Sequence, residues 1–207
     1  MHWLTYIFPR TVLKTSSQYN RDIRVVEESG EYKLLVNGAT ETGRYIKKIL
    51  QFAFSKLEIL QRKKVRRILV LGVAGGTIIR LLHDAYPTAE IIGVDIDRVM
   101  IELGKKYFGL KNIPKLTFIV DDAKDFVMKS QVKKYDCIVI DLFIGRDIPE
   151  FESSREFLKN IRSLLSPHGC VFINYLKELE YPEALQKVFS KVKHVDIEYN
   201  RFFLAQK

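Results

Sequence analysis

The sequence contains few of the residues that build metal centres or disulfide frameworks. Among its 207 residues there are only two cysteines and four histidines. Neither Cys137 nor Cys170 has a CxxC partner or a nearby histidine, so we expect no metal site. Each cysteine lies inside an apolar, strand-like run, which predicts buried free thiols in a reducing cytosol. No serine–histidine–acid or cysteine–histidine pattern stands out either.

Long apolar stretches are also missing. No run approaches the roughly 18 residues that span a bilayer. The first ten residues, MHWLTYIFPR, have neither a long hydrophobic segment nor a small-residue cleavage site. We therefore expect no membrane span, no signal peptide and a cytoplasmic location. A hydrophobic fraction of 47% excludes a disordered chain, and the length predicts one main α/β domain with a small appendage.

Acidic residues are scarce in the first third of the chain. Residues 1–66 hold 13 Lys and Arg against 6 Asp and Glu, whereas residues 67–207 hold 21 and 19. A basic segment can attract nucleic acid, but solvated surface charge explains it more simply. The densest cluster, at 62–67, precedes the first strand of the main domain, and ligands bind at the opposite edge of such sheets. A nucleic-acid partner is therefore possible but not favoured.

The segment from 67 to 97 organises the rest of the chain. An apolar run at 67–71 is typical of a buried parallel strand, a helical pattern follows from Thr77, which can cap it, and a second strand at 90–94 ends in Asp95. Three glycines separate the first strand from the helix: Gly72, Gly75 and Gly76. Glycines permit a tight turn and close ligand approach, and a carboxylate at the second strand tip can bind both ribose hydroxyls. This pattern predicts a nucleoside-binding βαβ unit, although an ordinary glycine-rich crossover shares it.

The residues before this unit predict a small β element and a helix. Strands are expected at 11–15, 23–28 and 32–36, with tight turns at Ser29-Gly30 and Asn37-Gly38. So few strands are marginal alone, so the main domain or a partner subunit in a homodimer must cover them. From Gly43 the apolar spacing becomes helical as far as Leu60. We divide the chain into a β-hairpin element at 1–42, a connecting helix at 43–64 and a Rossmann-like domain at 65–207.

The remainder alternates between strands and helices. Strands are expected at 116–120, 135–140 and 170–174, and helices at 98–108, after Asp122, from Ser153 or Ser154 to Leu165, and at 182–189. This order predicts a doubly wound, mostly parallel α/β sheet. Two final strands, 193–199 and 202–206, are joined by a tight turn at Asn200-Arg201 and must be antiparallel. An antiparallel terminal hairpin is typical of class I methyltransferase sheets, so it favours an S-adenosyl ligand over NAD. The glycine turn, GVAGG, likewise does not read GxGxxG.

Three strands of this sheet end in carboxylates, which converge on one crevice. Asp95, followed by Ile96, is placed to hold the ribose of a nucleoside. Asp122 can accept a hydrogen bond from an adenine amino group while the Ala123 N–H donates to the ring. Asp141 is placed beside the reacting centre, where it can orient an amine or take its proton. The alternative is that one or more of these acids only cap the following helices.

The motifs together resemble the spermidine synthase (polyamine aminopropyltransferase) family over nearly the whole chain. The stretches that carry the resemblance are SSQYNRDIRVVEESGEYKLLVNG, LGVAGGTIIRLL, GVDIDRVMIELGKKYF, FIVDDAKDFV, YDCIVIDLF and SREFLKNIRSLLSPHGCVFIN. The resemblance implies decarboxylated S-adenosylmethionine as donor and a small amine such as putrescine as acceptor. It implies that Asp95 binds ribose, that Asp122 and Ala123 bind adenine, and that Asp141 is the catalytic acid/base. It also places Tyr19 and Asn20 beside the cofactor.

Several positions depart from the pattern of that family. Ala74 replaces an acid in the glycine motif, Ile144 replaces the second acid of the active-site loop, and Asn20 replaces glutamine. The acidic segment and the tyrosine–histidine pair expected after the N-terminal strands are not evident in ATETGRYIKK.

The loop DLFIGRDIPEF resembles that of spermidine synthase-like proteins, and we expect Leu142 and Asp147 in it to contact the substrate. Ammonium groups without acidic partners cost several kcal/mol. Methyl transfer from S-adenosylmethionine, with an anionic or RNA acceptor, is therefore an alternative. Nucleoside binding without catalysis is a second alternative.

Overall fold

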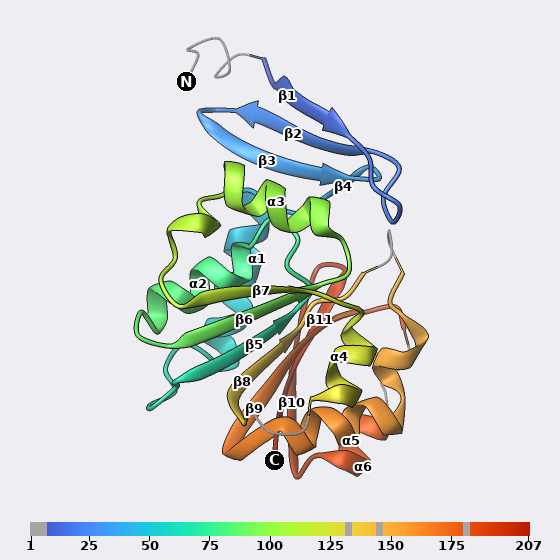
Figure 1. Ribbon diagram of the computed structural model, residues 1–207. Helices are drawn as coiled ribbons and strands as arrows, with labels where there is room; N and C mark the ends of the chain where they lie inside the picture. Colours follow the sequence, from blue (N-terminus) through green and yellow to red (C-terminus); the bar gives the residue numbers. More distant parts are fainter. Residues whose placement is uncertain (1–7, 131–133, 144–146, 180–182) are drawn as a thin grey trace.

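The computed structural model describes residues 8–130, 134–143, 147–179 and 183–207. A small antiparallel sheet lies at one end of a larger α/β unit (Figure 1). The small sheet has the order β1-β2-β3-β4. Its strands are β1 Arg10–Thr15, β2 Ile23–Glu28, β3 Glu31–Val36 and β4 Ala39–Thr40. Strands β2 and β3 meet at the predicted Ser29-Gly30 turn, because Glu28 pairs with Glu31.

The larger sheet has seven strands among the described residues, in the order β10-β11-β9-β8-β5-β6-β7. They are β5 Arg67–Leu71, β6 Glu90–Asp95, β7 Leu116–Val120, β8 Tyr135–Ile140, β9 Leu165–Leu176, β10 Lys191–Ile197 and β11 Asn200–Gln206. Strands β5 to β9 pair in parallel, whereas β11 is antiparallel to both β9 and β10. The predicted doubly wound, mostly parallel sheet with a terminal antiparallel hairpin is thereby confirmed.

Helices cover both faces of this sheet (Figure 1). The helices are α1 Arg44–Lys56, α2 Thr77–Ala85, α3 Arg98–Tyr107, α4 Ala123–Lys129, α5 Arg155–Leu164 and α6 Glu183–Val188, with 3-10 turns at η2 Leu110–Asn112 and η3 Glu150–Ser153. On one face, Phe54 of α1 packs edge-on against Phe172 of β9, with ring centroids 4.7 Å apart. On the other, Phe157 and Ile161 of α5 join a second buried cluster. In the part of the chain that the structure describes, no helix is long and apolar enough to cross a membrane.

Helix α3 packs against the small sheet and holds it on the main domain. Met100 and Leu103 pack against buried residues of the small sheet, including Ile23 and Leu34. At the start of α3, the buried Asp97 carboxylate accepts hydrogen bonds from the Ser17 hydroxyl, the Asn20 side-chain amide and the Val99 N–H. The main domain therefore covers one face of the small sheet. The division of the chain at 42 and 64 and the homodimer stay predictions.

Four local expectations were wrong. The final hairpin turns at Glu198-Tyr199, because Ile197 pairs with Asn200 and Glu198 has a left-handed φ of 55°. Thr77 is the first residue of α2 and caps nothing; the cap position is Gly76, whose φ is 75°. Helix α1 ends at Lys56, since Glu58 turns left-handed, rather than at Leu60. Strand β9 begins at Leu165, earlier than predicted, because Leu165 already pairs with Tyr135.

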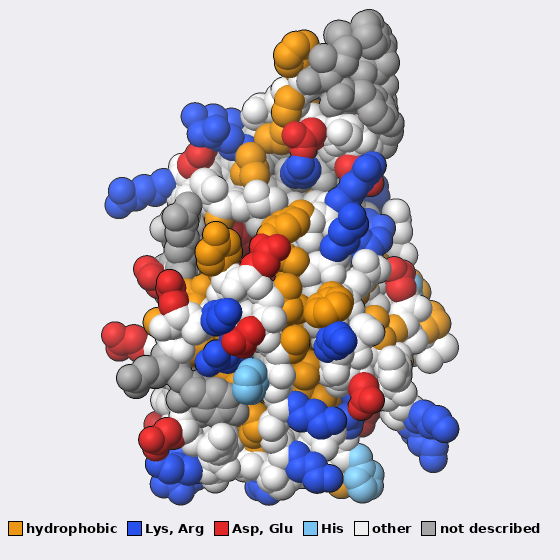
Figure 2. Space-filling model, turned by 180° about the vertical axis from the view of Figure 1, so that it is seen from behind, with side chains coloured by type: hydrophobic (Ala, Val, Ile, Leu, Met, Phe, Trp, Pro, Cys, Tyr) orange, Lys and Arg blue, Asp and Glu red, His pale blue; other side chains and the backbone are white. Residues whose placement is uncertain are grey.

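Charged side chains of both signs are mixed on the surface seen from behind (Figure 2). Hydrophobic side chains form a band down the middle of this face, and Lys and Arg alternate with Asp and Glu on both sides. The basic cluster at 62–67 precedes β5, at the edge opposite the carboxyl ends of the strands.

Candidate active site

The glycine turn after β5 is where the strand ends meet. Gly72 has a φ of +88°, and a Cβ placed there would lie 2.0 Å from the backbone oxygen of Asp141. Its N–H donates to the carbonyl oxygen of Val94, over 2.9 Å. Only glycine fits this close approach, because a side chain would push β8 away from β5. Gly72 thus brings the end of β8, and with it Asp141, against the turn.

Asp95 holds the backbone of this turn. One of its carboxylate oxygens accepts from the N–H groups of Val73 and Ala74, at 2.9 and 3.3 Å, and the other accepts from the Asp97 N–H at 2.8 Å. Burial raises the pKa of Asp95, and the three backbone hydrogen bonds oppose that effect. Ile96 follows it with 38% of its surface exposed, an apolar contact beside an acid. The roles of Asp95 and Ile96 toward a nucleoside remain proposals.

Asp122 caps helix α4. One carboxylate oxygen accepts from the N–H groups of Lys124 and Asp125, at 2.7 and 3.3 Å. The capping alternative therefore applies to Asp122, although the cap engages only one of its two carboxylate oxygens. Ala123 is the first residue of α4. Contacts of Asp122 and Ala123 with an adenine ring stay a proposal.

Asp141 follows β8, and two side-chain amides in series, on β9 and β11, hold its carboxylate. The Asn174 side-chain amide, on β9, donates to an Asp141 oxygen over 2.8 Å. The Asn200 amide, on β11, donates in turn to the Asn174 oxygen over 2.8 Å. Burial raises the pKa of Asp141 to about 6, the nearby Asp95 adds to this, and the Asn174 hydrogen bond opposes it. The hairpin that distinguishes this sheet thus orients the predicted catalytic acid.

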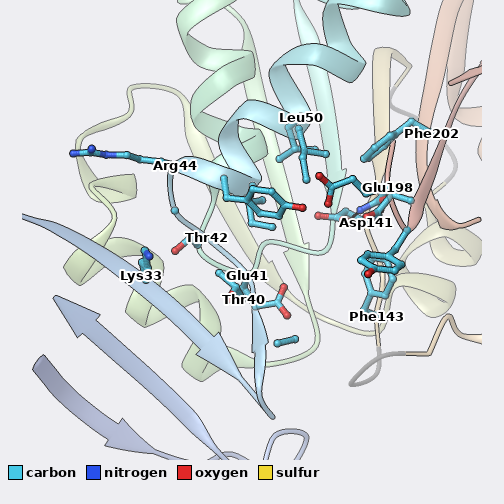
Figure 3. A pocket seen from close by; sticks show the side chains of 18 of the residues that line it. Lys33, Thr40, Glu41, Thr42, Arg44, Leu50, Asp141, Phe143, Glu198 and Phe202 are labelled. Carbon is cyan, nitrogen blue, oxygen red and sulfur yellow. Dashed lines mark hydrogen bonds between the residues drawn. The ribbon is translucent and has the colours of Figure 1, made fainter. Parts of the chain in front are cut away.

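Asp141 lies in a cavity of about 1090 Å³ between the small sheet, α1 and the ends of β8, β9 and the hairpin. Figure 3 shows the carboxyl groups of Glu41, Asp141 and Glu198 pointing into this space. They come from three different connections: the segment between β4 and α1, the end of β8 and the β10–β11 turn. The charged residues that line it are Glu28, Glu31, Glu41, Asp141, Glu178, Glu198, Lys33, Arg44 and Lys177.

Two of the three basic residues among the described pocket lining form ion pairs with neighbouring acids. Lys33 forms an ion pair with Glu28, and the Arg44 guanidinium pairs with Glu31 at 3.0 Å. The remaining charged lining is four carboxyls, of Glu41, Asp141, Glu178 and Glu198, against the single Lys177. A chain with a formal charge of +9 therefore places a strongly acidic pocket beside its predicted catalytic residue. Such a pocket suits a cationic ligand.

Glu41 is a site residue that the sequence did not reveal. Its N–H donates to the Leu34 carbonyl oxygen over 2.9 Å, which anchors the segment between β4 and α1. The next residue, Thr42, is wedged against the glycine turn, since a Cβ on Gly75 would lie 2.0 Å from its methyl group. Burial, with Asp141 and Asp95 nearby, raises the pKa of Glu41 to about 7.

No sequence signal identified this acid. The stretch ATETG has neither strand nor helix periodicity, and only the contact with Gly75 places it.

A second missed acid is Glu152, in η3. Its side chain is 2% exposed and neither oxygen has a hydrogen-bond partner within the described residues. Burial, with Asp141 nearby, raises its pKa well above the usual value. A protonated, neutral carboxyl is the form that such surroundings favour.

Four other predicted site residues have different surroundings, and their roles toward a ligand remain predictions. The Asn20 side chain donates to Asp97 at 2.9 Å and accepts from Asn37 at 3.0 Å, so it serves the junction between the small sheet and α3. Tyr19 is 42% exposed, and Leu142 packs beside the second core cluster. Asp147 is exposed, and the described pocket lining includes none of Tyr19, Asn20 and Asp147. Ile144 and Arg146 lie outside the described residues.

The two thiols have no part in this site. Cys137 and Cys170 are buried and form no disulfide. They lie opposite each other in the register of the neighbouring strands β8 and β9. Within the described ranges, no group of three or more histidine, cysteine, aspartate or glutamate side chains is arranged to hold a metal ion.

The sheet order, the terminal hairpin and the acids at the strand ends define a class I methyltransferase-like fold. Residues 47–205 match the family model described as the spermine/spermidine synthase domain, and the chain belongs to that family. It is 33% identical over 118 residues to a polyamine aminopropyltransferase of Vibrio vulnificus, covering 56% of this chain and 40% of the relative.

Two further comparisons concern a methyltransferase homolog and a solved structure. The chain is 29% identical over 145 residues to an eEF1A lysine and N-terminal methyltransferase homolog of Drosophila melanogaster, covering 64% of this chain and 22% of that protein. Its fold matches the crystal structure of a probable spermidine synthase from Corynebacterium glutamicum with a TM-score of 0.81 and 19% identity, over 95% of this chain and 80% of that one. The matches thus span less than half the length of these two curated relatives, both of which are transferases by name.

Proposed function

We propose that the protein transfers an aminopropyl group from decarboxylated S-adenosylmethionine to a small polyamine-type amine. The observation that carries this proposal is the acidic pocket around Asp141: among its described lining residues, carboxyls that form no ion pair with another described residue outnumber such bases, in a basic chain. Polyamines and the decarboxylated donor are cations, and clustered carboxylates neutralise such ligands. Membership of the spermine/spermidine synthase family supports the same reaction.

The residues at the strand ends fit an S-adenosyl nucleoside. Asp95 beside the exposed Ile96 offers an acceptor for ribose hydroxyls next to an apolar surface. Asp122, after β7, offers an acceptor for an adenine amino group, and Ala123 offers a backbone N–H to the ring. When bound, the donor supplies an electrophilic carbon beside a sulfonium. Each aspartate keeps room for a further hydrogen bond, because a carboxylate oxygen can accept more than one.

Asp141 is the residue that we assign to proton transfer. Its pKa of about 6 leaves it mostly ionised near neutral pH and still basic enough to take a proton from an attacking amine. The amide relay through Asn174 and Asn200 fixes the orientation of its carboxylate. An amine held between Asp141 and the acidic wall of the pocket would form a bond to the carbon beside the sulfonium. The carbon–sulfur bond would break with its electron pair going to sulfur, which releases methylthioadenosine, and the proton of the amine would pass to Asp141.

Methyl transfer from S-adenosylmethionine is the second candidate, and the similarity to the Drosophila methyltransferase homolog favours it. The acidic pocket predicts an amine acceptor for this reaction also. An anionic or RNA acceptor fits poorly, because its phosphates would meet Glu41, Asp141 and Glu198. Nucleoside binding without catalysis is the remaining alternative.

The test is turnover with each donor. We expect purified protein given decarboxylated S-adenosylmethionine and putrescine to form spermidine and methylthioadenosine, detected by mass spectrometry. Asp141→Asn should lower the rate by about 10²- to 10⁴-fold, the usual contribution of a general base, and leave methylthioadenosine binding unchanged. Asp84→Asn, an exposed acid on α2, is the matched control. Binding without turnover that Asp141→Asn does not alter would favour the non-catalytic alternative.

A further inference from the structure

We propose that Glu41 determines donor specificity: its carboxylate, facing Asp141 across the pocket, binds the free ammonium group of the donor and repels donors that carry a carboxylate. This inference rests on the proposed function and assigns one residue to the choice between the two donors. It concerns an acid that belongs to no motif singled out in the sequence.

The first argument is position. Glu41 belongs to the segment that touches the glycine turn, since Thr42 lies against Gly75 and is itself fixed by the hydrogen bond from the Leu34 N–H to its hydroxyl, over 2.9 Å. The turn also receives Asp95, which contacts the backbone of Ala74. Glu41 therefore lies at the nucleoside end of the pocket. Figure 3 shows its side chain directed into the cavity, on the side opposite Asp141.

The second argument is charge. Glu41 is close enough to both Asp141 and Asp95 for each to raise its pKa. It therefore lies near both the acid assigned to the ribose and the acid assigned to catalysis, and it lines the same pocket as Asp141. The chain attached to the sulfonium of the bound donor would have to lie between Asp95, which is assigned to the ribose, and Asp141, which is assigned to catalysis. The neighbouring position in the turn, Ala74, supplies no charge, so Glu41 is the acid available there.

The third argument is what surrounds Glu41. Among the described residues, the basic side chains that line the pocket are Lys33, Arg44 and Lys177. Lys33 and Arg44 are already paired with Glu28 and Glu31. Within the described residues, no basic side chain forms an ion pair with Glu41, whereas Asp95, Asp141 and Glu198 add negative charge. An ammonium group relieves the repulsion among these acids, and a carboxylate increases it.

The two candidate donors differ in the charged groups at the end of the chain attached to sulfur. Decarboxylated S-adenosylmethionine ends in an ammonium alone, whereas the intact donor carries an ammonium and a carboxylate on the same carbon. Methylthioadenosine has neither group, so it reports the nucleoside site without this interaction. The three ligands therefore separate the effect of Glu41 from that of Asp95 and Asp122.

The experiment is calorimetric titration of the full chain with these three ligands at pH 8. We expect at least about tenfold tighter binding of the decarboxylated donor than of the intact donor. Glu41→Gln should weaken the decarboxylated donor by about tenfold, about 1.4 kcal/mol, and keep methylthioadenosine within about twofold. Glu183→Gln, which removes an acid on α6 that is paired with Lys187, should change none of the three affinities.

A measurement on the unaltered protein covers the case in which the variant folds poorly. Because the pKa of Glu41 is about 7, its ionised fraction falls by about tenfold between pH 8 and pH 6. If protonated Glu41 binds the decarboxylated donor about tenfold more weakly than ionised Glu41, its affinity, divided by that for methylthioadenosine, should fall by about fivefold over this range. Protonation of Asp141, whose pKa is about 6, adds a smaller fall, and Glu41→Gln should remove only the part that comes from Glu41.

The outcomes distinguish this inference from the proposed function. An unchanged donor ratio in Glu41→Gln, with methylthioadenosine still bound, would overturn the role of Glu41 alone. Turnover of putrescine by the unaltered protein would then leave the proposed function standing. Failure of the unaltered protein to bind methylthioadenosine would overturn both.

Discussion

Glu41→Gln should make the stability of the protein less dependent on pH. Glutamine keeps the size of the side chain and removes its proton equilibrium. The pKa of this carboxyl is raised from 4.5 to about 7 by burial, with Asp141 and Asp95 contributing. The folded protein therefore binds this proton more tightly than the unfolded chain. The stabilisation is greatest below pH 4.5 and is lost as the pH rises through about 7.

The size of the effect follows from the two pKa values. Each pKa unit corresponds to about 1.4 kcal/mol, so the full contribution is about 3 kcal/mol. About 2.5 kcal/mol of it falls between pH 5 and pH 8, since the carboxyl is mostly protonated in the folded protein at pH 5 and ionised at pH 8. The stability of the variant relative to the unaltered protein should rise by this amount over the same range.

Urea denaturation at pH 5, 6.5 and 8 measures this difference. Other ionisable groups are common to both proteins and largely cancel; Asp141, which loses a charged neighbour, does not cancel fully and reduces the change. Glu183→Gln is the control, because Lys187 lowers the pKa of Glu183 and its titration lies below this range. A difference between Glu41→Gln and the unaltered protein that stays constant within about 0.5 kcal/mol from pH 5 to pH 8 would refute the reasoning.

Two further predictions concern the architecture of the site. Asn174→Ala removes the hydrogen bond that lowers the pKa of Asp141, so the acid limb of the pH–rate profile should move to higher pH; an unmoved limb would contradict the relay. Gly72→Ala places a Cβ 2.0 Å from the Asp141 oxygen at a φ of +88° and should prevent folding or cost more than about 3 kcal/mol, whereas Gly38→Ala, at a similar φ of +84° with open space, should cost about 1 kcal/mol. Equal losses in urea melts of the two glycine variants would show that the close approach is not decisive.

The sequence predicted most of the main sheet because its strands are continuous apolar runs with clear ends. The ranges of β5, β7 and β8 match the expected residues, and Ser154 caps α5 as expected, accepting from the Phe157 N–H. The convergence of acids at the strand ends follows from parallel topology alone. The final hairpin was also predictable, but its turn was placed two residues late. Asn200 and Arg201 look like turn residues, yet Asn200 is a strand residue that pairs with Leu176 and binds Asn174.

The site residues that sequence reasoning missed depend on contacts between distant segments. Glu41 reaches the pocket because Thr42 packs on Gly75, more than thirty residues along the chain. Asn20 donates its side-chain amide to Asp97, a contact that the local sequence did not indicate, and its role beside a cofactor remains a prediction. Periodicity and motif spacing carry no information on either contact, since both arise only when the small sheet docks on the main domain.

The most direct test of the central claim is a donor competition. The protein is incubated with equal concentrations of decarboxylated and intact S-adenosylmethionine and with putrescine as the acceptor, and the products are identified by mass spectrometry. The acidic pocket around Asp141 predicts spermidine and methylthioadenosine as the main products. Methylated putrescine with S-adenosylhomocysteine, or no product from either donor, would contradict aminopropyl transfer.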